Sequence, residues 1–208
     1  MRHPWCGALG ILLSGLMPAA AEPSKAHDVD RASIVVRMYG QAESKLDDPT
    51  ARRTAGAILE RAGVQVFWLE CSVHSEGNDA ADPCNVTLGS NELVLRMVDV
   101  GVTNASHMDT LGFAWVDARA GGGSLATVYA DRVRQMARSA GIDEAELMGR
   151  VIAHEIGHLL LGTNQHARQG LMRASWSGAD LRRNRAIEWL FDGREGEMMR
   201  REIARRTP

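Results

Sequence analysis

The chain of 208 residues has little net charge and few aromatic residues, and it lacks a long apolar run. A formal net charge of −2 excludes the broad basic surface that nucleic-acid-binding proteins present, so we expect no nucleic-acid partner. No apolar stretch reaches the roughly 18 residues that a transmembrane helix needs, and we expect no stable membrane insertion. Hydrophobic residues nevertheless make up 45% of the chain, which excludes a disordered protein. These absences leave a globular domain, expected to be a monomer, of unspecified chemistry.

The first 21 residues have the layout of a cleaved export signal. Arg2 precedes an apolar stretch over residues 5–17, and the small residues at 19–21 have the spacing of a cleavage site. We therefore expect cleavage after Ala21 and an exported domain, periplasmic or extracellular, over residues 22–208. Its last part, residues 178–208, is expected to be a helical tail. A buried N-terminal helix is the alternative interpretation of residues 1–21.

Cysteine is scarce as well, with three residues in the chain. Cys6 falls within the predicted signal, which leaves Cys71 and Cys84. An even pair of cysteines in an exported protein predicts one disulfide, here closing a polar, turn-rich loop. Two alternatives remain, namely two free thiols and a metal site formed by both cysteines with His74.

The pattern of apolar residues predicts strands, then helices, in an α/β or α+β domain with a mixed sheet. Runs of β-branched residues predict strands, and apolar residues at helical spacing predict helices. Three consecutive glycines at 121–123 predict a flexible turn. The expected strands are 33–39, 64–69, 92–98, 113–116 and 126–129; the expected helices are 49–62, 131–139 and 143–161, with one or two more between 179 and 206.

The most informative segment follows residue 150. His154 and His158 are four residues apart, so on a helix their imidazoles lie one turn apart on one face and can converge on one metal ion. Glu155 follows His154, where its carboxylate can reach a water activated by zinc. The pattern HExxH would arise by chance in about 1% of chains of this composition. The segment therefore predicts a zinc site with Glu155 as general base.

A third protein ligand is required, and His166 is the best candidate. It lies four residues after Gly162, so a turn at this glycine can return it to the metal. A solvated loop histidine is the alternative interpretation of His166. Glu188 would replace it if the site instead takes two histidines and a distal glutamate.

This segment resembles the active-site motif of the metzincin clan of zinc metallopeptidases, HExxHxxGxxH followed by a methionine turn. Gly170-Leu171-Met172 is similar to the Met-turn, and the resemblance implies that Met172 underlies the metal without binding it. It also implies a metzincin-like mixed twisted sheet, a long active-site helix and a C-terminal helix. The chain has one residue more on each side of Gly162 than the family pattern, and Asn164 stands at the family's third-ligand position.

Residues 111–114 and 127–131 extend the resemblance upstream. They are similar to the edge strand and the following strand that border the cleft in matrixin-like members. The resemblance implies that an extended peptide pairs with Gly112, Phe113 and Ala114. The similarities, taken with the extra residues around Gly162 and with Asn164 at the third-ligand position, indicate an outlying, bacterial relative of the clan.

The sequence thus predicts a secreted zinc-dependent endopeptidase acting on peptide or protein substrates, with Zn²⁺ held by His154, His158 and His166. Two alternatives stay open. One is a zinc amidase acting on cell-wall peptides, because HExxH indicates the metal and the water but not the acyl group. The other is a non-catalytic secreted binding domain that keeps zinc for structure.

Overall fold

The computed structural model describes residues 32–40, 49–72, 82–99, 110–117, 119 and 121–207. The predicted export signal, the residues that follow it up to 31, and His74 lie outside these ranges. In chain order the elements are β1 (Ala32–Gly40), α1 (Pro49–Arg61), β2 (Val64–Ser72), β3 (Glu92–Val98), β4 (Gly112–Asp117), β5 (Gly122–Tyr129), α2 (Ala130–Ala140), α3 (Glu144–Leu161), α4 (Gly178–Arg183), the 3₁₀ helix η2 (Ala186–Trp189) and α5 (Gly193–Arg206).

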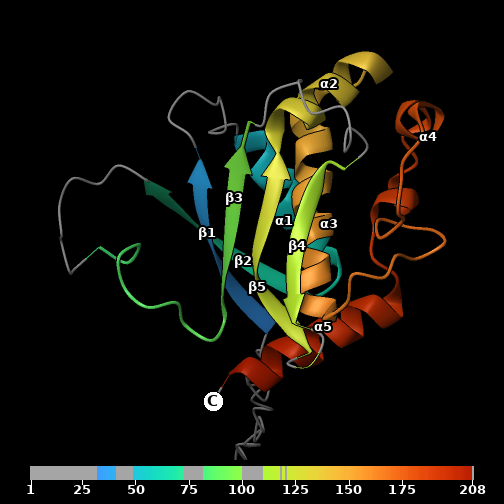
Figure 1. Cartoon of the computed structure of the whole chain (residues 1–208). Coiled ribbons are helices and arrows are strands. Elements are labelled where there is room, and N and C mark those ends of the chain that lie inside the picture. Colours follow the sequence, from blue (N-terminus) through green and yellow to red (C-terminus); the bar gives the residue numbers. More distant parts are fainter. Residues whose placement is uncertain are drawn as a thin grey trace, which may run out of the picture.

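The five strands form one mixed sheet in the order β2-β1-β3-β5-β4. β1 pairs in parallel with β2 and β3, and β3 in parallel with β5, whereas β4 runs antiparallel to β5 at one edge. α1 and α3 lie on the same face of this sheet (Figure 1) and pack against each other and against β2, β4 and β5. The mixed α/β architecture predicted from the sequence is confirmed.

Alternate residues of the strands build the core on the helical face of the sheet. Because successive side chains of a strand point to opposite faces, every second residue meets the helices. These buried residues include Ile34, Val36, Leu93, Leu95, Ala126 and Val128.

Helix α3 is the central element of this core. Almost every residue after its first turn is buried, including the polar residues Arg150, His154, Glu155 and His158, so the helix is packed on all sides. The Asp143 side chain accepts the amide proton of Glu146 at 2.7 Å and caps its N-terminus. Gly162, in the left-handed conformation with φ 65°, ends the helix. None of the helices in the described ranges combines the length and hydropathy needed to cross a bilayer.

The helices and strands lie close to the predicted ranges, with one correction at the glycine run. Of the three glycines, Gly121 lies in the turn, at φ 71°, whereas Gly122 and Gly123 already belong to β5. A Cβ atom at Gly123 would lie 2.2 Å from the carbonyl oxygen of Trp115, next to a bulge in β4. Glycine therefore serves here for a close approach of two backbones and not only for a flexible turn.

The predicted disulfide between Cys71 and Cys84 is present. Its formation excludes the alternatives of two free thiols and of a metal site with His74. The disulfide ties the end of β2 to residues 82–91, the segment that precedes β3. Two hydrogen bonds hold this segment against β1: the Tyr39 hydroxyl donates to the Cys84 carbonyl, and Arg37 donates to the Val86 carbonyl. Arg37 is buried and also forms an ion pair with Glu92 at the start of β3.

The disulfide should stabilise the domain. Cys71 and Cys84 are 13 residues apart, and closing a loop of about this length stabilises a protein by about 3 kcal/mol through the unfolded state. We expect the double variant C71A/C84A to lose about this much free energy of unfolding in a urea titration. Wild-type protein kept in reductant provides the control and should lose a similar amount. Unchanged midpoints in both samples would contradict the expectation.

Candidate active site

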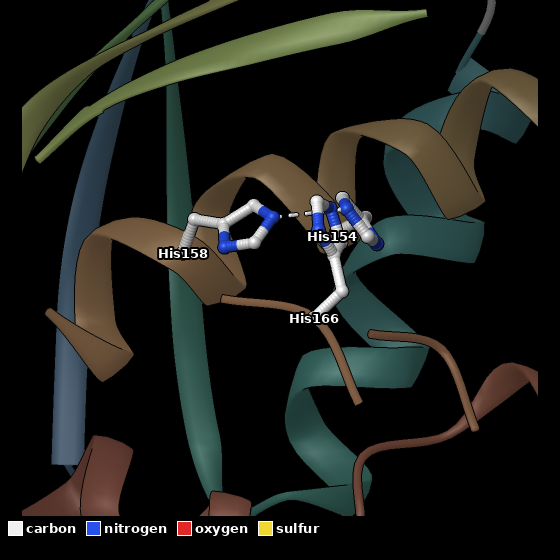
Figure 2. Close-up of side chains that lie close together, drawn as sticks. All are labelled: His154, His158 and His166. Carbon is white, nitrogen blue, oxygen red and sulfur yellow. Dashed lines mark hydrogen bonds between the residues drawn. The ribbon is translucent and has the colours of Figure 1, made fainter. Parts of the chain in front are cut away.

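Helix α3 places two histidines and one glutamate in a single pocket. His154 and His158 lie one turn apart, both buried, with ring centroids 4.7 Å apart and Nε2 atoms 3.0 Å apart. Figure 2 shows the two rings turned toward each other, with His166 approaching from a separate segment. The helical spacing seen in the sequence therefore produces the convergence that was predicted from it.

Two main-chain carbonyls determine the protonation of these rings. His154 Nδ1 donates to the Leu171 carbonyl at 2.9 Å, and His158 Nδ1 donates to the Thr163 carbonyl at 2.7 Å. A carbonyl oxygen can only accept, so the single proton of each neutral imidazole resides on Nδ1. The Nε2 lone pairs of both rings then face each other with no proton between them, an arrangement that suits binding of one metal ion.

The histidines are held in the neutral form that binds metal. Burial lowers the pKa of His154 to about 3, with a further decrease from the neighbouring His158 and His166. Burial is also the main cause that lowers the pKa of His158 and of His166. At neutral pH the three side chains therefore offer uncharged nitrogen ligands.

His166 joins the two helical histidines. The ligand atoms of the three side chains all lie within 4.8 Å of one another. The His166 ring is stacked on His154 and perpendicular to His158, with centroid distances of 5.4 and 4.9 Å. His166 is solvent-exposed and lies in the loop after α3, as the interpretation as a solvated loop histidine has it, but its ring packs against both helical histidines, which favours its role as the third ligand.

The other two candidate ligands lie differently. Glu188 is outside the histidine cluster and has its Oε2 atom 3.9 Å from Arg183. Asn164 lines the same cavity as the histidines, but a side-chain amide is not among the usual ligands of zinc.

The segment around Met172 packs against α3 and contacts His154. Leu171 and Met172 are buried, and the carbonyl that accepts from His154 belongs to Leu171. A Cβ atom at Gly157 would lie 2.8 Å from the Met172 sulfur, so this sulfur packs directly against the backbone of α3 between the two histidines. The Ala167 amide donates to the Met172 carbonyl at 2.8 Å, which fastens the residue after His166 to the same turn. Met172 thus packs against α3 next to the histidines, and its role as a Met-turn under a metal ion stays a prediction.

Glu155 lies beside the first residue of β4. Its side chain is buried, and burial raises its pKa to about 8. A Cβ atom at Gly112 would lie 2.5 Å from Glu155 Oε1 and 2.7 Å from its Cγ. The carboxyl group therefore occupies space that only a glycine leaves free, and β4 and the catalytic candidate are in direct contact.

A cavity of about 520 Å³ joins these groups. Its lining comes from the start of β4, from α3 and from the segment from Arg173 to Trp176, together with Asn164 and His166. The Trp176 ring meets the His154 ring edge-on at 5.6 Å. Trp176 and the carbonyls of Thr163 and Leu171 were not among the site residues predicted from the sequence. A tryptophan in a polar stretch was a weak signal, whereas main-chain acceptors leave no trace in the residue types.

Comparison with known proteins gives the fold but no family membership. No family model matches the chain, and no curated protein matches it. Its structure is similar to archaemetzincin from Methanopyrus kandleri, with a TM-score of 0.52 and 18% identity over 83% of this chain and 97% of that one. It is also similar to a zinc-dependent peptidase from Methanocorpusculum labreanum, with a TM-score of 0.50 and 18% identity over 79% and 99%. The chain thus has a metzincin-like fold, and these structures do not bear on a matrixin-like relation.

The buried carboxyl group should make the stability of the metal-free protein depend on pH. A folded-state pKa of about 8, above the usual 4.5, means that Glu155 stabilises the fold fully below pH 4.5 and that this contribution is lost as the pH rises through about 8. Glu155→Gln removes the titration. We expect the free energy of unfolding of the chelator-treated variant to exceed that of wild type by an amount that grows between pH 5 and pH 9. Urea titrations at several pH values measure it, and a constant difference would contradict the expectation.

Proposed function

We propose that this protein is an exported zinc-dependent endopeptidase. One observation carries the proposal: His154, His158 and His166 bring their ligand nitrogens together in an open cavity, beside the buried Glu155 carboxyl group. Two main-chain carbonyls orient the His154 and His158 rings so that their Nε2 lone pairs are free to bind a metal ion. The fold shared with archaemetzincin and with a zinc-dependent peptidase supports the proposal. The apolar run in residues 1–21 and the disulfide support export into an oxidising compartment.

The donor set fits zinc. Three neutral imidazoles are ligands that zinc favours, and three protein ligands are typical of catalytic sites, in which one position stays open. His154, His158 and His166 would hold the ion. When bound, zinc lowers the pKa of a water molecule to about 7 and polarises a carbonyl group.

Glu155 would move the proton during peptide hydrolysis. Its carboxylate would take a proton from the attacking water and pass it to the amine nitrogen of the leaving group. The position of Glu155, in the same cavity as the histidines and shielded from solvent, suits both transfers. Its contact with Gly112 keeps the carboxyl group next to the strand on which the substrate would lie.

The start of β4 would bind the substrate backbone. β4 is an edge strand, and Gly112, Phe113 and Ala114 line the cavity. An extended peptide can add to such an edge through main-chain hydrogen bonds. A cell-wall amidase could use the same zinc ligands and the same glutamate. The free edge of β4 favours a peptidase, because an extended peptide backbone can form main-chain hydrogen bonds along a strand. The cavity beside Glu155 likewise favours catalysis over a purely structural zinc site.

Zinc binding should depend on all three histidines. Wild-type protein is expected to contain about one zinc ion per chain. His154→Ala and His166→Ala should each lose zinc during dialysis, because two imidazoles bind the ion less firmly than three. Elemental analysis measures the content, and circular dichroism verifies the fold. Asn164→Ala is the matched control: Asn164 lines the same cavity, but its amide is not a usual zinc ligand, so this variant should keep the zinc content of wild type. Full zinc retention in His166→Ala would remove His166 from the site.

Activity should depend on Glu155 independently of zinc. Glu155→Gln keeps the size of the side chain but removes the proton acceptor, so peptide turnover should fall about a hundredfold to ten-thousandfold with the zinc content unchanged. A fluorogenic peptide library and elemental analysis measure the two quantities. Glu144→Gln, an exposed change in the first turn of α3, is the matched control and should keep wild-type turnover. Equal turnover in Glu155→Gln and wild type would disprove the proposed mechanism.

A further inference from the structure

We infer that Phe113 and Trp115 select the substrate, so that the enzyme prefers extended peptides with apolar side chains at alternate positions. This inference rests on the proposed function of the cavity. Both residues belong to the edge strand β4, and they are among the most exposed large apolar side chains, at 47% and 66% exposure. The function proposed for the histidine cluster does not account for their exposure.

The hydrogen-bond register determines which main-chain groups of β4 face outward. Tyr129 donates its amide proton to the Leu111 carbonyl at 2.9 Å, so Leu111 points its backbone toward β5. In an antiparallel ladder the bonded residues alternate. Phe113, paired with Thr127, therefore bonds inward to β5, while Gly112 and Ala114 direct their amide and carbonyl groups away from it. No strand in the described ranges pairs with this outer edge.

The side chains of β4 alternate in the opposite sense between the two faces. Gly112 and Ala114 are buried on the side of α3 and the cavity. The Phe113 and Trp115 side chains lie on the other face of the sheet, with ring centroids 6.3 Å apart in an edge-to-face arrangement, and Phe113 also borders the cavity. Trp115 pairs with Leu125 of β5, which continues the apolar surface inward from the edge. We call Phe113 and Trp115 the aromatic pair.

A peptide bound along Gly112 and Ala114 must place every second side chain beside the aromatic pair. Directly opposed residues of neighbouring strands point to the same face, with Cβ atoms about 4.5–5.5 Å apart. Substrate side chains opposite Gly112 and Ala114 thus enter the cavity, whereas those opposite Phe113 and Trp115 lie against exposed rings. Apolar side chains there remove aromatic surface from water, and polar ones do not. The bulge after Trp115 ends the regular pairing, which limits the selection to these two positions.

The opposite edge of the sheet offers a matched comparison. Phe67 on β2 is 52% exposed, and the strand pairings place it on the same face as Phe113 and Trp115. It does not line the cavity that contains the histidines. Phe67→Ala therefore removes an equally exposed aromatic ring without touching the proposed docking strand.

The test uses two fluorogenic peptides that differ only at two alternate positions, leucine in one and serine in the other. Wild-type zinc enzyme should cleave the leucine peptide with a kcat/KM about fivefold to tenfold higher, the effect of two cross-strand apolar pairs. The variant F113A/W115A should cleave the two peptides with equal kcat/KM while keeping its zinc content, because the apolar surface that distinguishes leucine from serine is gone. Phe67→Ala should behave as wild type. A parallel binding series in the E155Q background, read by anisotropy of labelled peptides, should show the same ranking.

The outcomes separate this inference from the proposed function. Cleavage of both peptides at equal rates, or a preference that persists in F113A/W115A, overturns the role of the aromatic pair and leaves the peptidase function intact. Tighter binding of the leucine peptide that depends on the aromatic pair, without any cleavage by wild type, supports the docking site and overturns the peptidase function.

Discussion

The candidate site depends on two hydrogen bonds to main-chain carbonyls. His154 and His158 each commit their only proton to a carbonyl, one from Leu171 and one from Thr163. The two Nε2 atoms are then 3.0 Å apart in a buried pocket, and their lone pairs repel each other unless a positive charge lies between them. The acceptors lie in the chain that follows α3, so the path of this chain decides whether the two helical histidines form a metal site or only a pair of buried rings.

That path is set at Gly162. A left-handed residue ends α3 there, and a Cβ atom would lie 2.2 Å from the carbonyl oxygen of Gly121, so the position must be glycine for conformation and for space. The chain then supplies the Thr163 carbonyl, His166 and the buried turn at Met172 in succession. The spacing between His158 and His166 is longer than in the metzincin motif, and the structure accommodates it by continuing α3 to Leu161 before the turn.

Gly112 connects the two halves of the proposed chemistry. Its backbone begins the outward-facing edge of β4, and its missing side chain provides the space for the Glu155 carboxyl group. Peptide binding and proton transfer would therefore meet at one residue. The alternation along β4 adds a second consequence, because the strand that turns Gly112 and Ala114 toward α3 must turn Phe113 and Trp115 toward solvent.

The sequence by itself determined the local features of this protein. The spacing of His154, Glu155 and His158, the ends of α3 and most strands follow from periodicity and capping within a few residues, and the disulfide follows from there being two cysteines outside the predicted signal. Only the tertiary structure decided that His166 joins the cluster while Glu188 lies apart, that two carbonyls orient the rings, that Trp176 borders His154, and that Gly122 and Gly123 belong to a strand. These outcomes depend on contacts between segments that are distant in the chain, which local sequence patterns do not determine. Every residue also has a backbone carbonyl, so the residue type does not indicate which carbonyl accepts from a given histidine.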